Sequence, residues 1–357
     1  MQFNNYSPFP GIAWEFVTSE SDYFITAVAR AKFKFVPIYD GLNWGLIPDS
    51  DQGELFDADV YYGEVGQSAV RYESDYVGYK PNTDIILNAH AHAPKMKRGK
   101  SWKTSVEIYS HNHEFLKKYS LVVRGEKKYR RFGLLWLSLG RKKEVSIPIR
   151  YERARGGTIS KSYKNKYKSP KVLYVNPENP IGCGIKKIGN PIKTVYAPQI
   201  FYADKKHSAP AGFGFINRAW KTRVSKAGTY NEQWLEHQHP LPPKDFDDSY
   251  NQAAHPELIM DGYLRGGANF HLDNLTPNNL IRSFTLPDYS FISRTNTHTG
   301  EIYKEMNIDT VIIDLEGENS DNFRAYISYR SRTPKTQAVT SVDVLFSDMS
   351  KKVKHGN

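Results

Sequence analysis

The 357-residue sequence has almost no cysteine and no long apolar run. Its one cysteine, Cys183, cannot form an internal disulfide, so the expected fold does not depend on an oxidising compartment. No apolar run approaches the roughly 20 residues of a membrane-spanning helix. The opening MQFNNYSPFPGIAWEF also lacks the basic and then apolar pattern of a secretory signal. We therefore expect a cytoplasmic protein with no membrane partner.

The motifs of several enzyme classes are also missing. There is no GxSxG nucleophile elbow and no HExxH or CxxC metal motif, and the Gly-rich string NPIGCGIKKIG (179–189) has neither the GxGxxG spacing nor the GK[ST] ending of a phosphate loop. This string is instead typical of a turn. The carboxylates of PLPPKDFDD favour turns in which they accept backbone N–H bonds, rather than acid–base work; they are Asp245, Asp247 and Asp248. We predict no catalytic residue and no cofactor.

Two histidine pairs have the alternate spacing that would place both rings on one face of a strand; they are His90 with His92 and His111 with His113. Each pair offers two zinc ligands. A catalytic zinc site needs a third ligand, for which the fold would have to bring in Glu114 or Asp84. We interpret the histidines as ordinary polar residues and predict no metal site. A zinc-dependent hydrolase stays an alternative.

Positive charge is concentrated in one segment. Residues 95–168 hold 22 Lys and Arg against 5 Glu, or +17, so the rest of the +11 chain carries 11 − 17 = −6. Aromatic residues are interleaved with these charges; they include Trp102, Tyr119, Tyr129, Phe132, Trp136, Tyr151, Tyr163 and Tyr167. Phosphate neutralisation with base stacking would suit a nucleic-acid-binding protein, which is the main alternative function. If the aromatics belong to strands, they form core and the lysines a solvated face.

Strand patterns dominate the chain. Between about residues 24 and 35 the odd positions are apolar, while Lys32 and Lys34 take the other face. Further strands are predicted at 84–92, 104–110, 119–123, 132–139, 310–315 and 323–330, and 310–315 is typical of a strand covered on both faces. We predict a mainly β fold: a large antiparallel β-sandwich or barrel-like sheet scaffold with long Pro/Gly-rich loops and few short helices.

The expected organisation is a single β-rich domain over residues 1–357. N-terminal strands occupy 1–155, a loop-rich insertion follows at 156–279, and C-terminal strands fill 280–357. The insertion is dense in Pro, Gly and Asn, with one short helix expected at 231–237. Loops this long usually have a function, so we expect excursions from the sheet that build a binding surface.

Large aromatic and arginine side chains carry most of the energy of protein interfaces. The candidate partner-binding residues of the insertion are therefore Trp220, Arg223, Tyr230, Trp234 and Phe246. The alternative, which the sequence leaves open, is that they pack the loops onto the sheet.

Several strings follow one another in a recognisable order. They are DYVGYKPNTDIILNAHAHAP (75–94), IPIRYERARGG (147–157), NPIGCG (179–184), PAGFGFINRAWKTR (210–223), AGTYNEQW (227–234) and LPPKDFD (241–247). Taken together they resemble a family of domains of unknown function encoded beside type VI secretion spike genes. LVVRGEKKY (121–129) departs from the family pattern at Glu126 and Tyr129, and AAHPEL (253–258) replaces an element that commonly ends in Asp-Gln.

Members of that family act as adaptors or chaperones for secreted effectors. The resemblance therefore implies a cytoplasmic, non-catalytic adaptor that binds an effector and a spike protein of the VgrG or PAAR type. It assigns no binding residue to this chain. Nucleic acid is not the expected partner, because a basic stripe is necessary for such binding but far from sufficient.

Overall fold

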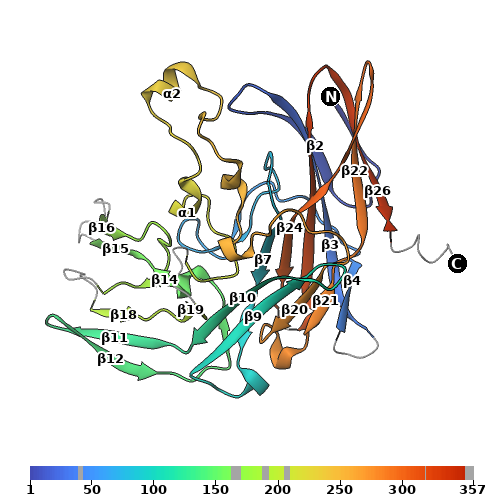
Figure 1. Cartoon of the computed structure of the whole chain (residues 1–357). Helices are drawn as coiled ribbons and strands as arrows, with labels where there is room; N and C mark the ends of the chain where they lie inside the picture. The colour runs from blue at the N-terminus through green and yellow to red at the C-terminus, as the bar shows by residue number, and fades with distance from the viewer. Residues whose placement is uncertain (39–42, 162–169, 187–192, 205–209, 318, 350–357) are drawn as a thin grey trace.

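The computed structural model describes residues 1–357 apart from 39–42, 162–169, 187–192, 205–209, 318 and 350–357. Strands make up 48% of it and helices 9%, and a large curled sheet of 11 strands forms a half-barrel (Figure 1). The predicted mainly β fold with few short helices is confirmed. None of the described helices is long and apolar enough to cross a membrane.

The half-barrel is mostly antiparallel, with parallel pairing between β21 and β4 and between β24 and β7. Its strands in spatial order are β19 (Ile200–Tyr202), β10 (Phe115–Arg124), β9 (Ser101–Tyr109), β20 (Asn269–Asp273), β21 (Ser283–Thr285), β4 (Asn43–Pro48), β3 (Tyr23–Pro37), β25 (Arg324–Pro334), β24 (Asn307–Asp314) and β7 (Asp84–Asn88), with β2 (Gly11–Val17) pairing beside β3.

The central strands follow the predicted patterns. In β3 the odd positions from Ile25 to Phe35 are buried, while Lys32 and Lys34 lie on the other face within 3.7 and 3.2 Å of Asp49. Strand β24 is buried on both faces, as its apolar run predicts. The alternation of apolar side chains therefore placed these strands correctly.

A second sheet packs against the first. Its order is β1 (Gln2–Asn5), β26 (Val339–Asp348), β22 (Tyr289–Thr297) and β23 (Gly300–Glu305). Phe291 of β22 lies 4.3 Å, centroid to centroid, from Tyr329 of β25, and the Ser331 hydroxyl donates to Ser293 at 2.7 Å. The core is continuous and takes in residues of all three predicted segments, such as Ile85, Phe213 and Ile312.

Smaller sheets surround this body. β11 (Lys127–Phe132), β12 (Leu135–Arg141) and β18 (Thr194–Tyr196) form a three-stranded sheet, and β11 and β12 make a hairpin that reaches away from the body in Figure 1. The two-stranded pairs are β5 (Val60–Tyr61) with β6 (Val70–Tyr72), β8 (His90–His92) with β13 (Ser146–Pro148), β14 (Arg155–Gly156) with β17 (Cys183–Gly184), and β15 (Thr158–Lys161) with β16 (Lys171–Val175).

Two predicted strands have different bounds. The one expected at 132–139 is interrupted by a tight turn in which Gly133 has φ of 57°, so β11 ends there and β12 begins at Leu135. The one expected at 84–92 divides into β7 and β8 at Ala89. The insertion also holds short strands, and β20 within it belongs to the half-barrel. Local apolar patterns were too short to reveal these.

The described helices are short. They are α1 (Lys221–Val224), α2 (Glu232–His237) and 3-10 turns at Pro94–Met96, Tyr151–Arg153, Asp248–Asn251, Pro256–Leu258, Pro277–Asn279 and Ser320–Asn322. The predicted helix at 231–237 is confirmed by α2. It begins after Asn231 because the Asn231 side chain caps it, accepting the Trp234 N–H at 2.9 Å. In Figure 1 α2 lies at the end of an arm above the sheet.

Candidate functional site

The segment from Glu73 to Asp84 carries four ionisable side chains into the interior of the protein. Glu73, Asp75, Lys80 and Asp84 are all buried. A buried charge is costly unless it is paired and hydrogen-bonded, so the partners of these four residues decide what the segment does.

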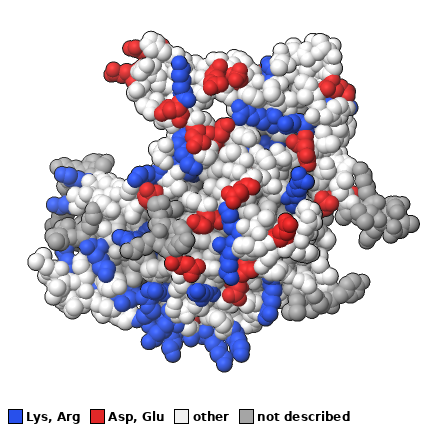
Figure 2. All heavy atoms as spheres, in the orientation of Figure 1, with Lys and Arg blue, Asp and Glu red and all other residues white. Residues whose placement is uncertain are grey.

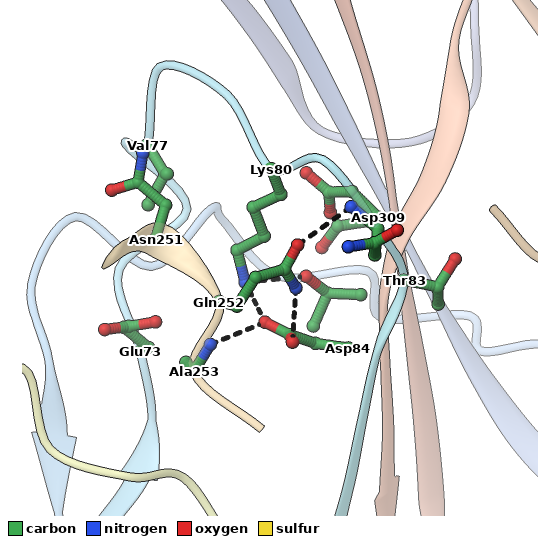
Figure 3. Close-up of polar contacts among 12 residues, drawn as sticks. Glu73, Val77, Lys80, Thr83, Asp84, Asn251, Gln252, Ala253 and Asp309 are labelled. Atoms are coloured by element: carbon green, nitrogen blue, oxygen red, sulfur yellow. Dashed lines mark hydrogen bonds and ion pairs between the residues drawn. The ribbon is translucent and has the colours of Figure 1, made fainter. Parts of the chain in front are cut away.

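Lys80 and Asp84 form the centre of this network (Figure 3). The Lys80 ammonium lies 2.8 Å from the Asp84 carboxylate and donates to the Thr310 hydroxyl of β24 at 3.0 Å. Asp84 also accepts the Gln252 amide at 2.6 Å and the backbone N–H of Ala253 at 2.8 Å. One ion pair thus joins the start of β7 to β24 and to the insertion.

Lys80 is held in its charged form. Burial on its own lowers the pKa of a lysine, but the carboxylates of Asp84, Asp309 and Glu73 outweigh burial and raise the pKa of Lys80 above its ordinary value. A lysine acts as a nucleophile only when it is neutral. The arrangement therefore suits Lys80 to a structural role, in which its ammonium holds Asp84 and Thr310 in place.

Glu73 makes the second connection to the insertion. Its carboxylate accepts from the Arg223 guanidinium at 2.5 Å and from that of Arg218 at 3.3 Å. Arg223 further donates to the carbonyl oxygens of Tyr250 and Ile216, at 2.8 and 3.0 Å. Burial would raise the pKa of Glu73, yet the surrounding cations, Arg223 first among them, hold it below its usual range. Glu73 thus stays ionised beside them.

Asp75 connects the segment to the half-barrel. It pairs with Arg30 of β3, and Arg330 of β25 donates to the Asp75 carbonyl oxygen at 3.0 Å while pairing with Asp309. Burial raises the pKa of Asp75. Two central strands and the insertion are therefore held by one short segment.

Three of the recognised strings meet at a second node. The Asn179 amide of NPIGCG donates to the carbonyl oxygens of Tyr151 and Arg155, at 2.8 and 3.2 Å, in YERARGG. The Tyr151 hydroxyl donates to the Gly214 carbonyl oxygen of PAGFGF at 3.0 Å. Gly157 has φ of 116°, and a Cβ there would lie 2.5 Å from the Gly182 carbonyl oxygen, so only glycine fits. These strings have a structural role in the described chain.

The predicted partner-binding residues do not share one surface. Trp220 and Arg223 are buried, and Trp220 packs edge-on against Tyr151 at 5.2 Å, so neither side chain is presented to a partner in this conformation. Phe246 is half-buried and lines a hollow that Phe16 also lines. Packing of the loops explains these positions, because the insertion must be held on the sheet.

Tyr230 and Trp234 lie together on the arm. Their rings are 4.7 Å apart, Tyr230 is 57% exposed, and the half-buried Trp234 donates its indole N–H to the Leu241 carbonyl oxygen at 2.9 Å. Trp234 lines a hollow of about 220 Å³; the other lining residues are Thr229, Asn231, Gln233, His237, Gln238, Pro243, Lys244 and Asp245. Aromatic side chains are enriched in protein interfaces, so the exposed Tyr230 beside Trp234 suits contact with another polypeptide.

Two of the three acidic turn residues, Asp245 and Asp247, behave as the turn interpretation predicts. Asp245 accepts the Thr229 N–H at 2.9 Å and Asp247 the Ser249 N–H at 2.8 Å. Asp248 instead pairs with Arg332 at 3.1 Å.

The histidine pairs differ from one another. His90 and His92 lie on β8 with ring centroids 6.2 Å apart, and the nearest carboxylate oxygen to His90 is that of Glu316 at 4.0 Å. His111 and His113 lie in the turn between β9 and β10, so strand spacing does not apply to them. Within the described ranges, no three His, Cys, Asp or Glu residues are grouped so as to hold a metal ion.

The aromatics of the basic segment are divided between core and surface. Trp102, Tyr119 and Tyr151 are buried and cannot stack on bases in this conformation. Tyr163 and Tyr167 lie outside the described residues. Tyr129, Phe132 and Trp136 belong to the projecting hairpin.

Sequence reasoning missed the network around Lys80 and Asp84. The available signal was the string KPNTD, which leads two opposite charges four residues apart into an apolar strand. Its partners, Thr310 and Ala253, are too distant in sequence to be found from local patterns.

Together, the fold and the two nodes define a class of β-rich protein in which long loops are fixed onto a half-barrel by buried ion pairs and glycine-dependent turns. The chain belongs to a bacterial family described as "Uncharacterized protein conserved in bacteria (DUF2169)", whose family model matches residues 21–322. No curated protein matches the chain, and no solved structure does. The family description states no activity, substrate or partner.

Proposed function

We propose that the chain is an adaptor of type VI secretion that binds an effector and helps to load it onto a spike protein of the VgrG or PAAR type. It does so by shape and contact rather than by chemistry. The ordered strings described above support this proposal, because they resemble those of effector adaptors over most of the chain.

The observation that carries the proposal is the arm bearing α2. Tyr230 and Leu235 are exposed by 57% and 60%, while the base of the arm is fixed in the interior by Trp220 and Arg223. A rigid base with exposed aromatic and aliphatic side chains at its end loses little conformational entropy on binding, which favours affinity. The arm is thus suited to contact a protein partner.

An affinity pull-down from a bacterium with an active type VI secretion system tests the proposal. The wild-type chain should recover an effector or a spike protein, and the double variant Tyr230→Ala with Leu235→Asp should lose it. Tyr303→Ala, a tyrosine of similar exposure on β23, is the matched control and should behave as wild type. Recovery of neither partner, together with intact secretion after deletion of the gene, would contradict the proposal.

A further inference from the structure

The hairpin of β11 and β12 combines an apolar face with an open sheet edge. Leu135, Leu137 and Leu139 alternate along β12 and are 69%, 50% and 57% exposed. Phe132 lies opposite Leu135 in the strand register and is exposed as well. Leu134, in the turn, is 82% exposed. A soluble protein rarely leaves so continuous an apolar row in water unless something covers it.

Strand β12 also lacks a second neighbour. In the three-stranded sheet the order is β12, β11 and β18, and among the described residues β12 pairs with β11 alone. An edge strand presents a row of N–H and C=O groups that can accept a further strand. No charged residue interrupts it from Leu135 to Gly140. The edge therefore lacks one common protection against strand addition.

The charge around this row is mostly positive, with Glu126 at the base of the hairpin pairing with Lys142 at 2.6 Å and lying 4.0 Å from Lys128. From Lys127 to Lys143 the chain holds Lys127, Lys128, Arg130, Arg131, Arg141, Lys142 and Lys143, and no Asp or Glu. Arg130 lies opposite Leu137 in the register, on the face of the leucine row. Figure 2 shows Lys and Arg gathered at the lower middle of the molecule, next to the lower-left region into which the hairpin reaches in Figure 1. An occupant of this face would gain from acidic side chains.

We propose that β12 binds an extended, acidic segment of a partner protein as an added strand. Alternate apolar side chains of that segment would cover Leu135, Leu137 and Leu139, its carboxylates would meet the surrounding cations, and its backbone would complete the open edge.

Three other occupants fit the hairpin less well. A bilayer could cover the leucines but could not satisfy the backbone groups of the edge. Nucleic acid would meet the cations and could stack a base on Phe132, but it has no peptide N–H and C=O groups to complete the strand edge and no apolar side chains to cover the leucines. A second copy of the chain, paired through β12, would bring two strongly basic hairpins together. Only an acidic polypeptide satisfies the apolar row, the edge and the charge at once.

A labelled peptide tests the inference on the full chain. The probe is a fluorescein-labelled peptide of alternating Val and Glu, as long as β12, and its binding is followed by fluorescence anisotropy. We expect saturable binding that weakens with added salt, as an interaction between exposed charges does. Replacing every Glu of the probe by Lys should weaken binding by at least about tenfold.

Backbone methylation separates strand addition from side-chain contact alone. Because alternate N–H groups of an extended strand point to opposite sides, methylating either the odd or the even residues of the probe should abolish binding, and the other set should leave it largely intact. If both methylated probes bind like the parent, or if the Lys probe does, the inference is wrong.

Variants of the chain complete the test. Leu137→Lys should weaken probe binding by at least about tenfold, whereas Leu173→Lys, an exposed leucine on β16, should not. Both variants should melt at the wild-type temperature, since both side chains are exposed. The inference is overturned if the probe does not bind. If phosphatidylserine vesicles, oligothymidylate or a second copy of the chain binds instead, and Leu137→Lys abolishes that binding, the hairpin binds that occupant.

This inference does not depend on the adaptor function. The peptide titration measures binding at the β12 edge, and the pull-down measures binding through the α2 arm. A negative result in one experiment therefore does not contradict the proposal that the other experiment tests.

Discussion

The carboxylate of Asp84 accepts the backbone N–H of Ala253 at 2.8 Å, although the two residues are 169 positions apart in the chain. The same carboxylate neutralises Lys80. Asp84 therefore joins strand β7 to the middle of the insertion while it neutralises a buried lysine. Together with the buried pair of Glu73 and Arg223, it holds the loops on the half-barrel.

Removing one partner of this pair should destabilise the protein strongly. Lys80→Met leaves the Asp84 charge buried and unpaired, and Asp84→Asn removes the carboxylate that pairs directly with the buried Lys80, so each should lower the free energy of unfolding by about 3–5 kcal/mol. The double variant should lose less stability than the sum of the two single variants, because no unpaired charge remains.

Urea denaturation measures the free energy of unfolding of each variant. The control is Lys118→Met, which breaks the exposed pair with Glu107 and should cost at most about 1 kcal/mol. Equal, small effects at Lys80 and Lys118 would contradict this account.

The glycine node makes a second prediction. Gly157→Ala puts a methyl group 2.5 Å from the Gly182 carbonyl oxygen at a backbone φ of 116°. We expect a loss of about 2 kcal/mol or more in the free energy of unfolding. Gly63→Ala is the matched control, since its new methyl group would lie 3.5 Å from Ser68 and clash with nothing. A Gly157→Ala protein as stable as the control would show that the turn tolerates a side chain.

Stability in acid should depend on His92. Burial, with a smaller contribution from His90, lowers the pKa of His92 to about 4 from 6.5. Between these two values the unfolded chain binds a proton that the folded chain does not, so stability falls as the pH drops from 6.5 to 4. His92→Gln should lessen that loss, whereas His298→Gln on the surface should not. Urea midpoints at several pH values test this, and an unchanged acid slope in His92→Gln would refute it.

The single thiol should react slowly. Burial raises the pKa of Cys183 to about 11, so it is a neutral thiol at ordinary pH and a poor nucleophile. Iodoacetamide at pH 8 should therefore modify the folded chain far more slowly than the chain in urea, and the rate should climb towards pH 11. Mass spectrometry follows the modification. Equal rates of modification in the folded protein and in urea would mean that burial does not protect the thiol, and would contradict this prediction.

The sequence predicted those parts of the fold that depend on neighbouring residues. The alternation in β3, the apolar run of β24 and the Asn231 cap of α2 are local signals, and each was read correctly. Strand β20 and the ion pairs of Glu73, Asp75 and Lys80 were not predicted, because their partners come from distant parts of the chain. Local sequence also could not tell that Trp220 and Arg223 are buried while Tyr230 is exposed, since all three are residue types common to cores and interfaces.

Hydrogen–deuterium exchange tests the central claim most directly: that buried ion pairs around Lys80 and Asp84 hold the insertion in a fixed shape. Peptides covering Ala253 should exchange as slowly as those of β3 in the wild-type chain. In Asp84→Asn, exchange should speed up around residues 210–258 while β3 stays protected. Rapid exchange at Ala253 in the wild type, or a variant whose insertion remains as protected as before, would contradict the claim.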